Sequence, residues 1–458
     1  MDVARYLRVH RPRMIRELGA LVSFPSVSSA AGARPALARC ADWLARHLRG
    51  LGAGDARVIA TAGHPIVVGR IAAGDLTESS AECPTVLIYG HYDVQPAAPQ
   101  AAWRHPPFAP VVEGEYLYGR GASDAKGQLF AHLKAIELWR AHGGPPVNLV
   151  FLIEGEEEIG SPSLRAVLDS LGPYLASDVA VVSDNAVLGP AQPSLTYALR
   201  GDLYLDVEVT GGPAELHSGN FGGAVHNPLR VLIRALAGLH GPDGAIRVPG
   251  FADAVAAAPP RERAYMRRAG PSDRALRAEA DGAPLGGDRA YTAYERATIR
   301  PSLEVAGVTG GYGGDGIRGV IPARAQAKLD VRLVANQDPD RVHRQVFAQL
   351  ARAIPRGLTL RTRERMRAAP IVLDRDHPAA RAAARAYRRG FGVAPVFVRA
   401  GGSIPIVSTL ADALGIPTVL MGFALPDDRA HGTDERFSLA MLDKAIATSA
   451  AFLEEIAR

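Results

Sequence analysis

The chain has 458 residues, of which 47% are hydrophobic and 22% charged. This length allows two or three domains with sizeable cores, and the composition is that of an ordinary globular protein, which excludes a disordered chain. The net charge of +5 arises from 52 basic and 47 acidic residues, a mixed surface that does not indicate nucleic-acid binding.

Cysteine content and hydrophobic segments narrow the class of protein further. Cys40 and Cys83 are too few for a disulfide framework, and their separation forms no CxxC metal or redox motif. Residues 1–18 lack the apolar core of a secretory signal. Because no apolar run reaches the roughly 18 residues that a membrane span needs, we expect a cytoplasmic protein that binds no membrane.

The first part of the chain predicts strands that alternate with helices. Leucine spacing predicts helices within residues 1–50. Short apolar or β-branched runs have the length of strands that are covered on both faces, and they lie at 85–89, 147–153 and 179–183. Helices fit between these strands at 128–141 and 163–170. This alternation is typical of a mainly parallel sheet in an α/β domain.

From residue 203 onward the pattern changes to clean alternation of apolar and polar residues, which is typical of half-solvated antiparallel strands. Such strands are predicted at 203–209, 325–334 and 358–362, and helices at 229–239 and 340–353. Asn227 followed by Pro228 is an N-cap pair that opens the first of these helices. We therefore expect an α+β insert at 200–368.

The last part of the chain returns to the first pattern. Helices are predicted at 376–389, 404–414 and 439–457, with a strand at 417–421. The fold class predicted from these elements is an α/β domain with a mainly parallel sheet, made of residues 1–199 and 369–458, which is interrupted by the α+β insert at 200–368.

Polar residues with metal-ligating or acid–base chemistry follow predicted strands or lie in loops before predicted helices. They are His91, Asp93, Asp124, Glu157, Glu158, Asp184 and His431. Open α/β sheets place ligand sites at the carboxyl ends of their strands. Each residue alone has a structural explanation: a solvated loop histidine, a helix N-cap at Asp124, or a solvated acidic turn at Glu157 and Glu158.

Taken together, two histidines and three carboxylates match the ligands of two zinc-type ions about 3.5 to 4 Å apart. A carboxylate two residues after His91 suits an acceptor that holds the second ring nitrogen of a ligating histidine. A GxSxG nucleophile elbow is absent from the sequence, and neither cysteine lies in a comparable loop, which disfavours nucleophilic catalysis.

Eight sequence blocks resemble the M20 metallopeptidases, most closely the dipeptidase branch that includes carnosinases. They are GHYDVQP (90–96), GRGASDAKG (119–127), EGEEEIGS (154–161), SDN (183–185), LHSGNFGG (216–223), VRLVANQDP (331–339), GGSIP (401–405) and HGTDE (431–435). The blocks occur in family order over nearly the whole chain. The resemblance implies a homodimer in which residues 1–199 and 369–458 form the catalytic domain and residues 200–368 form a lid and dimerisation domain.

The resemblance also implies roles for single residues of the catalytic domain. One ion would be held by His91, Asp124 and Asp184, and the other by Asp124, Glu158 and His431, with Asp124 as the bridge. Two divalent ions per chain are implied, zinc being expected and manganese or cobalt being the alternatives. Glu157 would be the general base, and Asp93 would orient His91.

In the insert, the resemblance implies that His217 stabilises the oxyanion in the active site of the opposite subunit. Arg332, with Gly402 and Ser403, would bind the C-terminal carboxylate of the substrate. The sequence departs from many dipeptidase relatives at Arg318-Gly319, where they carry Lys-Thr, and at Ala335, where they usually carry proline. Both departures concern the substrate more than the metals.

The predicted function is that of a dinuclear metal hydrolase that cleaves dipeptides or similar small amides. Asp184 favours this activity, because relatives that act on N-acyl amino acids tend to carry glutamate at that position. Hydrolysis of N-acyl or N-carbamoyl amino acids on the same metals stays open as an alternative. A metal-free binding protein is a second alternative, but it would require lost ligands, and none is missing. The sequence does not specify the substrate side chains, the physiological metal or the pathway.

Overall fold

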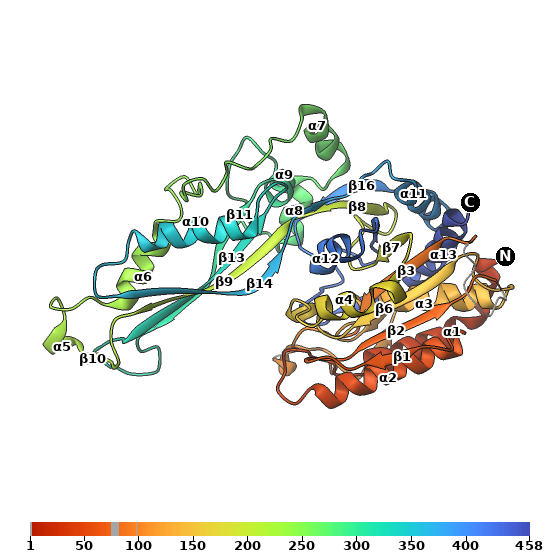
Figure 1. Ribbon diagram of the computed structural model, residues 1–458, viewed down its shortest axis with the longest axis horizontal. Helices are drawn as coiled ribbons and strands as arrows, with labels where there is room; N and C mark the ends of the chain where they lie inside the picture. The colour runs from red at the N-terminus through yellow and green to blue at the C-terminus, as the bar shows by residue number, and fades with distance from the viewer. Residues whose placement is uncertain (1, 75–81, 98) are drawn as a thin grey trace. The chain divides into compact units, whose positions relative to one another are not determined.

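The computed structural model describes residues 2–74, 82–97 and 99–458. The chain forms two compact units (Figure 1). Unit 1 comprises Met1–Tyr197, Leu373–Val398 and Ile406–Arg458, and unit 2 comprises Ala198–Val372 and Arg399–Pro405. Each unit has its own hydrophobic core.

The central sheet carries the strands that follow the first pattern of the sequence. Within the described ranges it has nine strands in the order β1-β2-β6-β3-β7-β17-β8-β15, with β16 paired to β8. Its middle strands run parallel: β6 (Asn148–Glu154), β3 (Thr85–His91), β7 (Val179–Val182) and β17 (Thr418–Met421). These are the four strands predicted from apolar runs, and the α/β fold with a parallel core is confirmed.

The flanking strands of this sheet run antiparallel, and the sequence patterns did not predict them. They are β1 (Arg57–Ile59), β2 (Ile66–Ile71), β8 (Ser194–Leu199) and β15 (Ile371–Val372), while β16 spans Val396–Ala400. A further small sheet contains β4 (Val111–Glu113), β5 (Tyr116–Tyr118) and β18 (Arg436–Ser438). Most of these segments are too short to show a clear period of two.

Helices bury the central sheet. Those that lie in unit 1 or begin at its boundary are α1 (Val3–Val22), α2 (Arg34–Gly50), α3 (Lys126–Arg140), α4 (Leu164–Leu175), α11 (Pro378–Phe391), α12 (Pro405–Leu414) and α13 (Leu439–Ile456). Every residue of β6 is buried, and its alternate side chains Leu149, Phe151 and Ile153 pack in one core with residues of α2, α3 and α13. Burial on both faces is the reason that the strand is a continuous apolar run.

Unit 2 contains a four-stranded antiparallel sheet in the order β11-β13-β9-β14. The strands are β9 (Gly201–Thr210), β11 (Ser302–Gly310), β13 (Arg324–Leu333) and β14 (Thr359–Ala368). Helices α6 (Pro228–Ala237) and α10 (Pro339–Ala351) contact β9 and lie along this sheet in Figure 1. Burial alternates along β9 and β13, which confirms the one-sided sheet.

The predicted cap of α6 is present, since Asn227 Oδ1 accepts hydrogen bonds from the backbone N–H groups of Leu229 and Arg230. The poorly patterned stretch 241–300 contains α7 (Pro260–Ala269), α8 (Asp273–Glu279) and α9 (Ala293–Ile299). Shorter elements are the 3₁₀ helices η1 (Gln100–Ala102) and η2 (Glu157–Ile159), helix α5 (Ser218–Phe221), and the paired strands β10 (Leu216–His217) and β12 (Val320–Ile321).

Among the helices that the structure describes, none combines the length and the apolar character needed to cross a bilayer.

Candidate active site

The carboxyl ends of three adjacent parallel strands supply most of the predicted metal ligands. His91 is the last residue of β3. Glu157 and Glu158 lie in η2, just after β6, and Asp184 follows β7 by two residues. Because parallel strands end at the same edge of a sheet, residues from distant parts of the chain meet there.

Asp124 and His431 come to this edge from loops. Asp124 lies two residues before α3, and His431 lies in the loop between β17 and β18. His431 has a positive φ of 62°, a backbone conformation that non-glycine residues seldom adopt. The loops therefore place these two side chains where a regular helix or strand would not.

The first group of potential ligands consists of His91, Asp124 and Asp184. His91 Nε2 lies 3.4 Å from Asp124 Oδ1 and 3.6 Å from Asp184 Oδ1. The His91 side chain is fully buried, and its Nε2 has no hydrogen-bond partner among the described residues. Since a buried polar atom without a partner is costly, this nitrogen is suited to a cation between the imidazole and the two carboxylates.

The second group consists of Asp124, Glu158 and His431. His431 Nε2 lies 2.9 Å from Asp124 Oδ2 and 3.3 Å from Glu158 Oε2. Gln95 Nε2 donates a hydrogen bond of 2.8 Å to the same Glu158 oxygen. Asp124 belongs to both groups, with one carboxylate oxygen facing His91 and the other facing His431. Imidazole nitrogens and carboxylate oxygens in this arrangement fit two divalent cations that share one carboxylate.

The protonation equilibria of the site reflect crowded carboxylates beside two imidazoles. Burial, followed by the charge of Asp124, raises the pKa of Asp184. Burial also raises the pKa of Glu157 well above its ordinary value. Contacts with Asp124 and Glu158 raise the pKa of His431 to about 10. Because a histidine must be deprotonated to bind a metal ion, cation binding at this site would compete with protonation of His431.

Asp93 connects the first metal group with the glutamates of η2. Its Oδ1 lies 3.4 Å from His91 Nδ1, and its carboxylate accepts hydrogen bonds from the backbone N–H groups of Glu157 (3.2 Å) and Glu158 (3.1 Å). The Asp93 side chain is fully buried. The residue predicted to orient His91 therefore also holds the backbone of the predicted base.

Two residues that sequence reasoning did not assign are buried beside this site. Glu435 accepts hydrogen bonds from the backbone of the Asp124 loop, and Arg120 pairs with Glu435. Both lie in sequence blocks that carry predicted ligands, GRGASDAKG and HGTDE. The presence of Arg120 and Glu435 in these two blocks was the only sign of them in the sequence. The sequence does not show that the two side chains form a pair.

In unit 2, the structure brings Arg332 next to Ser403. Arg332 Nη1 donates to Ser403 Oγ at 3.3 Å, and Gly402 precedes that serine. The guanidinium is also engaged by carboxylates: Asp330 contacts Nε and Nη2 at 2.9 Å each, and Asp202 Oδ2 lies 3.1 Å from Nη1. The predicted carboxylate-binding arginine is thus held in place by two aspartates of its own unit.

The 401–403 loop is attached to the start of β9 by Arg200. Arg200 Nε donates to the Gly401 carbonyl oxygen at 2.8 Å, and Ser403 Oγ donates to the Arg200 carbonyl oxygen at 2.7 Å. These bonds keep the loop beside Arg332.

His217 is the last residue of β10 and is exposed. Its Nδ1 accepts a hydrogen bond of 3.0 Å from the backbone N–H of Gly219, which caps the short helix α5. This bond uses Nδ1 as an acceptor, which leaves Nε2 as the ring nitrogen available to donate.

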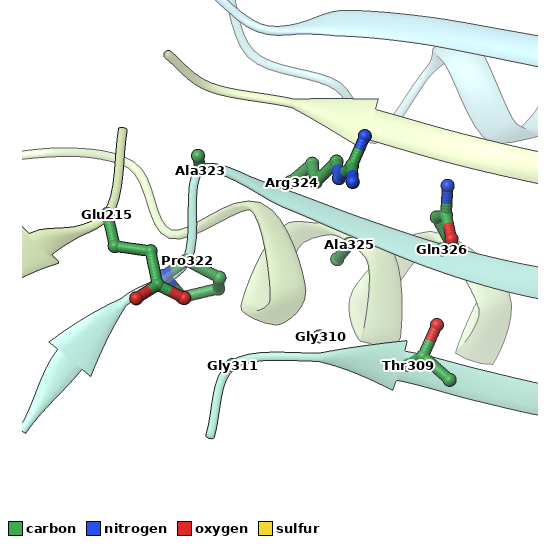
Figure 2. Close-up of a pocket in the computed structure, with 9 residues that line it drawn as sticks. All are labelled: Glu215, Thr309, Gly310, Gly311, Pro322, Ala323, Arg324, Ala325 and Gln326. Atoms are coloured by element: carbon green, nitrogen blue, oxygen red, sulfur yellow. The ribbon is translucent and has the colours of Figure 1, made fainter. Parts of the chain in front are cut away.

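A separate pocket lies in unit 2 where β11 ends and β13 begins (Figure 2). Its walls include Glu215, Thr309 and Arg324. None of the predicted metal-binding, catalytic or substrate-binding residues, all of which the structure describes, lines this pocket.

A parallel-core α/β unit with two imidazole–carboxylate groups at its carboxyl edge is the framework of a metal-dependent hydrolase. The chain matches the sequence profile of peptidase family M20/M25/M40 over residues 87–455, and it belongs to this family.

Among its relatives, the Cys-Gly metallodipeptidase dug1 of Schizosaccharomyces pombe is 32% identical over 98% of this chain and 96% of the relative. The Beta-Ala-His dipeptidase of Homo sapiens is 31% identical over 82% of this chain and 75% of the relative. The solved structure of the dipeptidase Dug1p from Saccharomyces cerevisiae has a TM-score of 0.89 at 29% identity and covers 99% of this chain and 98% of its own. The family resemblance and its dipeptidase branch are thus confirmed.

Proposed function

We propose that this protein is a metal-dependent dipeptidase that hydrolyses the peptide bond of dipeptides or similar small amides. The observation that carries the proposal is the shared carboxylate of Asp124, which faces His91 with one oxygen and His431 with the other. Similarity over nearly the full chain to a named metallodipeptidase supports the substrate class.

The metal centre would contain two divalent ions, with zinc as the expected metal and manganese or cobalt as alternatives. His91, Asp124 and Asp184 would hold one ion, and Asp124, Glu158 and His431 the other. Nitrogen and carboxylate ligands of this kind suit zinc, and the unpartnered Nε2 of buried His91 supports a cation beside it. When bound, such ions polarise a scissile carbonyl and acidify an attacking water.

Glu157 would act as the general base that takes a proton from the attacking water and passes it to the leaving amine. Two observations support this role. Asp93 holds the Glu157 backbone through a hydrogen bond of 3.2 Å, and burial raises the pKa of the Glu157 carboxyl. A glutamate with a raised pKa is better matched to proton transfer near neutral pH than an exposed glutamate.

Recognition of the substrate's C-terminal carboxylate would fall to Arg332, Gly402 and Ser403. The contact between Arg332 and Ser403 supports this grouping. Because Asp330 and Asp202 already contact the guanidinium, a substrate carboxylate would meet an arginine that is oriented in advance and partly neutralised. Pre-orientation lowers the entropic cost of binding, while shared charge lowers the Coulombic gain.

A homodimer in which His217 donates to the oxyanion of the opposite subunit's substrate completes the proposal. The edge strand β11 supports a second copy as the partner, because Val305 and Val308 are each more than 40% exposed on it. Ile317 is fully exposed in the segment between β11 and β12. Exposed apolar residues along a free strand edge are typical of a surface that pairs with another chain.

A cytoplasmic location is proposed as well.

Metal analysis combined with a substrate panel tests this function. Purified protein should contain two divalent ions per chain, lose activity with a chelator and regain it with zinc, manganese or cobalt. It should hydrolyse dipeptides faster than N-acetyl or N-carbamoyl amino acids. Active protein with one ion or none would contradict the dinuclear site, and a preference for N-acyl substrates would assign it to the alternative amidohydrolase activity.

A further inference from the structure

Glu435 is a fully buried carboxylate that organises the loop of Asp124. Its Oε1 accepts hydrogen bonds from the backbone N–H groups of Ser123 (2.9 Å) and Asp124 (3.0 Å). Its Oε2 accepts one from the backbone N–H of Gly121 at 2.9 Å. Three backbone N–H groups of the loop thus donate to one side chain that has no solvent exposure.

Arg120 makes the reciprocal connection from the Asp124 loop to the His431 loop. Its Nη1 donates to Glu435 Oε2 at 2.7 Å. Its Nη2 donates to the backbone carbonyl oxygens of His431 (3.1 Å) and Gly432 (2.9 Å), and more weakly to Pro96 (3.3 Å). The Arg120 side chain is only 3% exposed.

These bonds extend the connection between the two segments beyond the pairing of β5 with β18 and the backbone hydrogen bond from Gly119 N–H to the Glu435 carbonyl oxygen. His431 has a positive φ, and its side chain is 56% exposed, so its position depends on how the loop backbone is fixed. Asp124 and His431 belong to the same ligand group. The hydrogen bonds of Arg120 and Glu435 connect the backbones of the two loops. They therefore set the distance between the ligand atoms of Asp124 and His431.

We propose that Arg120 and Glu435 form a positioning pair that sets the metal affinity of the group Asp124–Glu158–His431, and that they affect the group His91–Asp124–Asp184 much less. The proposal rests on the proposed metal centre. Asp124 is common to both groups, but Arg120 contacts the backbone of His431, Gly432 and Pro96, whereas His91 ends β3 and Asp184 follows β7 by two residues. Residues behind metal ligands typically change affinity by roughly 10- to 100-fold when they are replaced.

The test is the binding of zinc to metal-free protein, measured by competition with a chromophoric chelator, for the wild type and for Glu435→Gln. The wild type should show two binding steps. His431→Ala should abolish one step, and Asp184→Ala the other, which assigns the steps to the two groups. Glu435→Gln should weaken the step that His431→Ala abolishes by roughly 10- to 100-fold and leave the other within about threefold.

Arg120→Lys provides a second variant that keeps the charge beside Glu435. A lysine ammonium cannot contact Glu435 and the two loop carbonyls with the fixed fork of a guanidinium, so the same step should weaken, by less than in Glu435→Gln. The matched control is Glu137→Gln, which breaks a partly buried ion-pair cluster with Lys134 and Arg13 near the C-terminal end of α3. This control should keep both binding steps, even where its thermal unfolding midpoint falls.

Several outcomes would overturn the inference: both steps unchanged in Glu435→Gln, both steps weakened equally, or the same selective loss in Glu137→Gln. Failure of both Glu435→Gln and Arg120→Lys to fold would also overturn it, because the pair would then hold the fold rather than the ligand spacing. Failure of the proposed function is distinguishable, since it would appear as wild-type protein that lacks two zinc-binding steps.

Discussion

Glu157 donates its backbone N–H to the carboxylate of Asp93 at 3.2 Å. The same carboxylate lies 3.4 Å from Nδ1 of His91. One buried side chain therefore links the orientation of a proposed ligand to the position of the proposed base. The two functions should fail together when this carboxylate is altered.

The first prediction concerns Asp93→Asn. The variant keeps one acceptor oxygen but replaces the other with an amide group that cannot accept a backbone hydrogen bond. We expect metal affinity to fall by roughly 10- to 100-fold and kcat to fall even at saturating metal. Chelator competition and steady-state kinetics at several zinc concentrations measure the two effects. Full recovery of kcat by added zinc would show that Asp93 does not position Glu157.

The second concerns Glu157→Gln, which preserves the shape of the side chain but removes its capacity to accept a proton. We expect two bound metal ions and a kcat lower by about 10² to 10⁴. Metal analysis and dipeptide hydrolysis are measured on the same preparation. A variant that keeps both ions and a near-normal rate would exclude Glu157 as the base.

The third concerns His217 and subunit exchange. His217→Ala removes an oxyanion donor, a loss of about 10² to 10³ in kcat. When His217→Ala and Glu157→Gln chains exchange subunits freely, half of the dimers are mixed, and each mixed dimer contains one intact site if His217 acts across the interface. Activity should recover to about a quarter of the wild-type value. Absence of recovery, with exchange verified by differently tagged chains, would place His217 outside the partner's site.

The fourth concerns the substrate carboxylate. If Arg332 binds this group through two parallel hydrogen bonds, amidating the C-terminus of a dipeptide should reduce kcat/KM far more in the wild type than in Arg332→Ala. The comparison uses one dipeptide and its amide with both proteins. An equal penalty in the two proteins would remove the proposed pairing. Ser403→Ala serves as the companion variant, because it loses a contact to Arg332 but keeps the guanidinium.

The fifth concerns acid stability and lies away from the metal centre. Burial, aided by the charge of Lys134, lowers the pKa of His47 to about 4, whereas an unperturbed histidine titrates near about 6.5. Between these values the unfolded chain binds more protons than the folded chain, so stability falls as the pH falls. The expected contribution of this residue is a loss of about 2 kcal/mol between pH 7 and pH 5.

His47→Phe should remove this dependence while retaining the ring that stacks on Trp43, whose centroid lies 4.8 Å away. Urea unfolding of metal-free wild type and variant at both pH values measures the difference. Because all other titratable groups are common to both proteins, only the difference in pH dependence between the two proteins is compared. Equal acid destabilisation of the two proteins would contradict the prediction.

The sequence predicts the parallel core well because its strands are buried on both faces. The apolar run of β6 extends along nearly the whole strand. The acidic residues Glu157 and Glu158 come shortly after it in the sequence. The sequence did not predict the antiparallel strand β1, because it has only three residues, all of intermediate exposure. Its partner β2 was not predicted either. Likewise, α9 lies in a stretch without clear hydrophobic spacing and is stabilised by a capping box between Thr292 and Glu295.

Local sequence by itself determined the four parallel strands, the cap of α6 and the chemical types of the residues at the strand ends, and the block pattern determined the family. Only the tertiary structure decided which oxygen of Asp124 faces which histidine. It also decided that Glu435 pairs with Arg120, which lies 315 positions away in the chain, and that Arg332 is engaged by Asp202 and Asp330. The physical reason is that hydrophobic periodicity records burial along one element, whereas hydrogen bonds between loops depend on where the packed sheet brings distant backbone groups together.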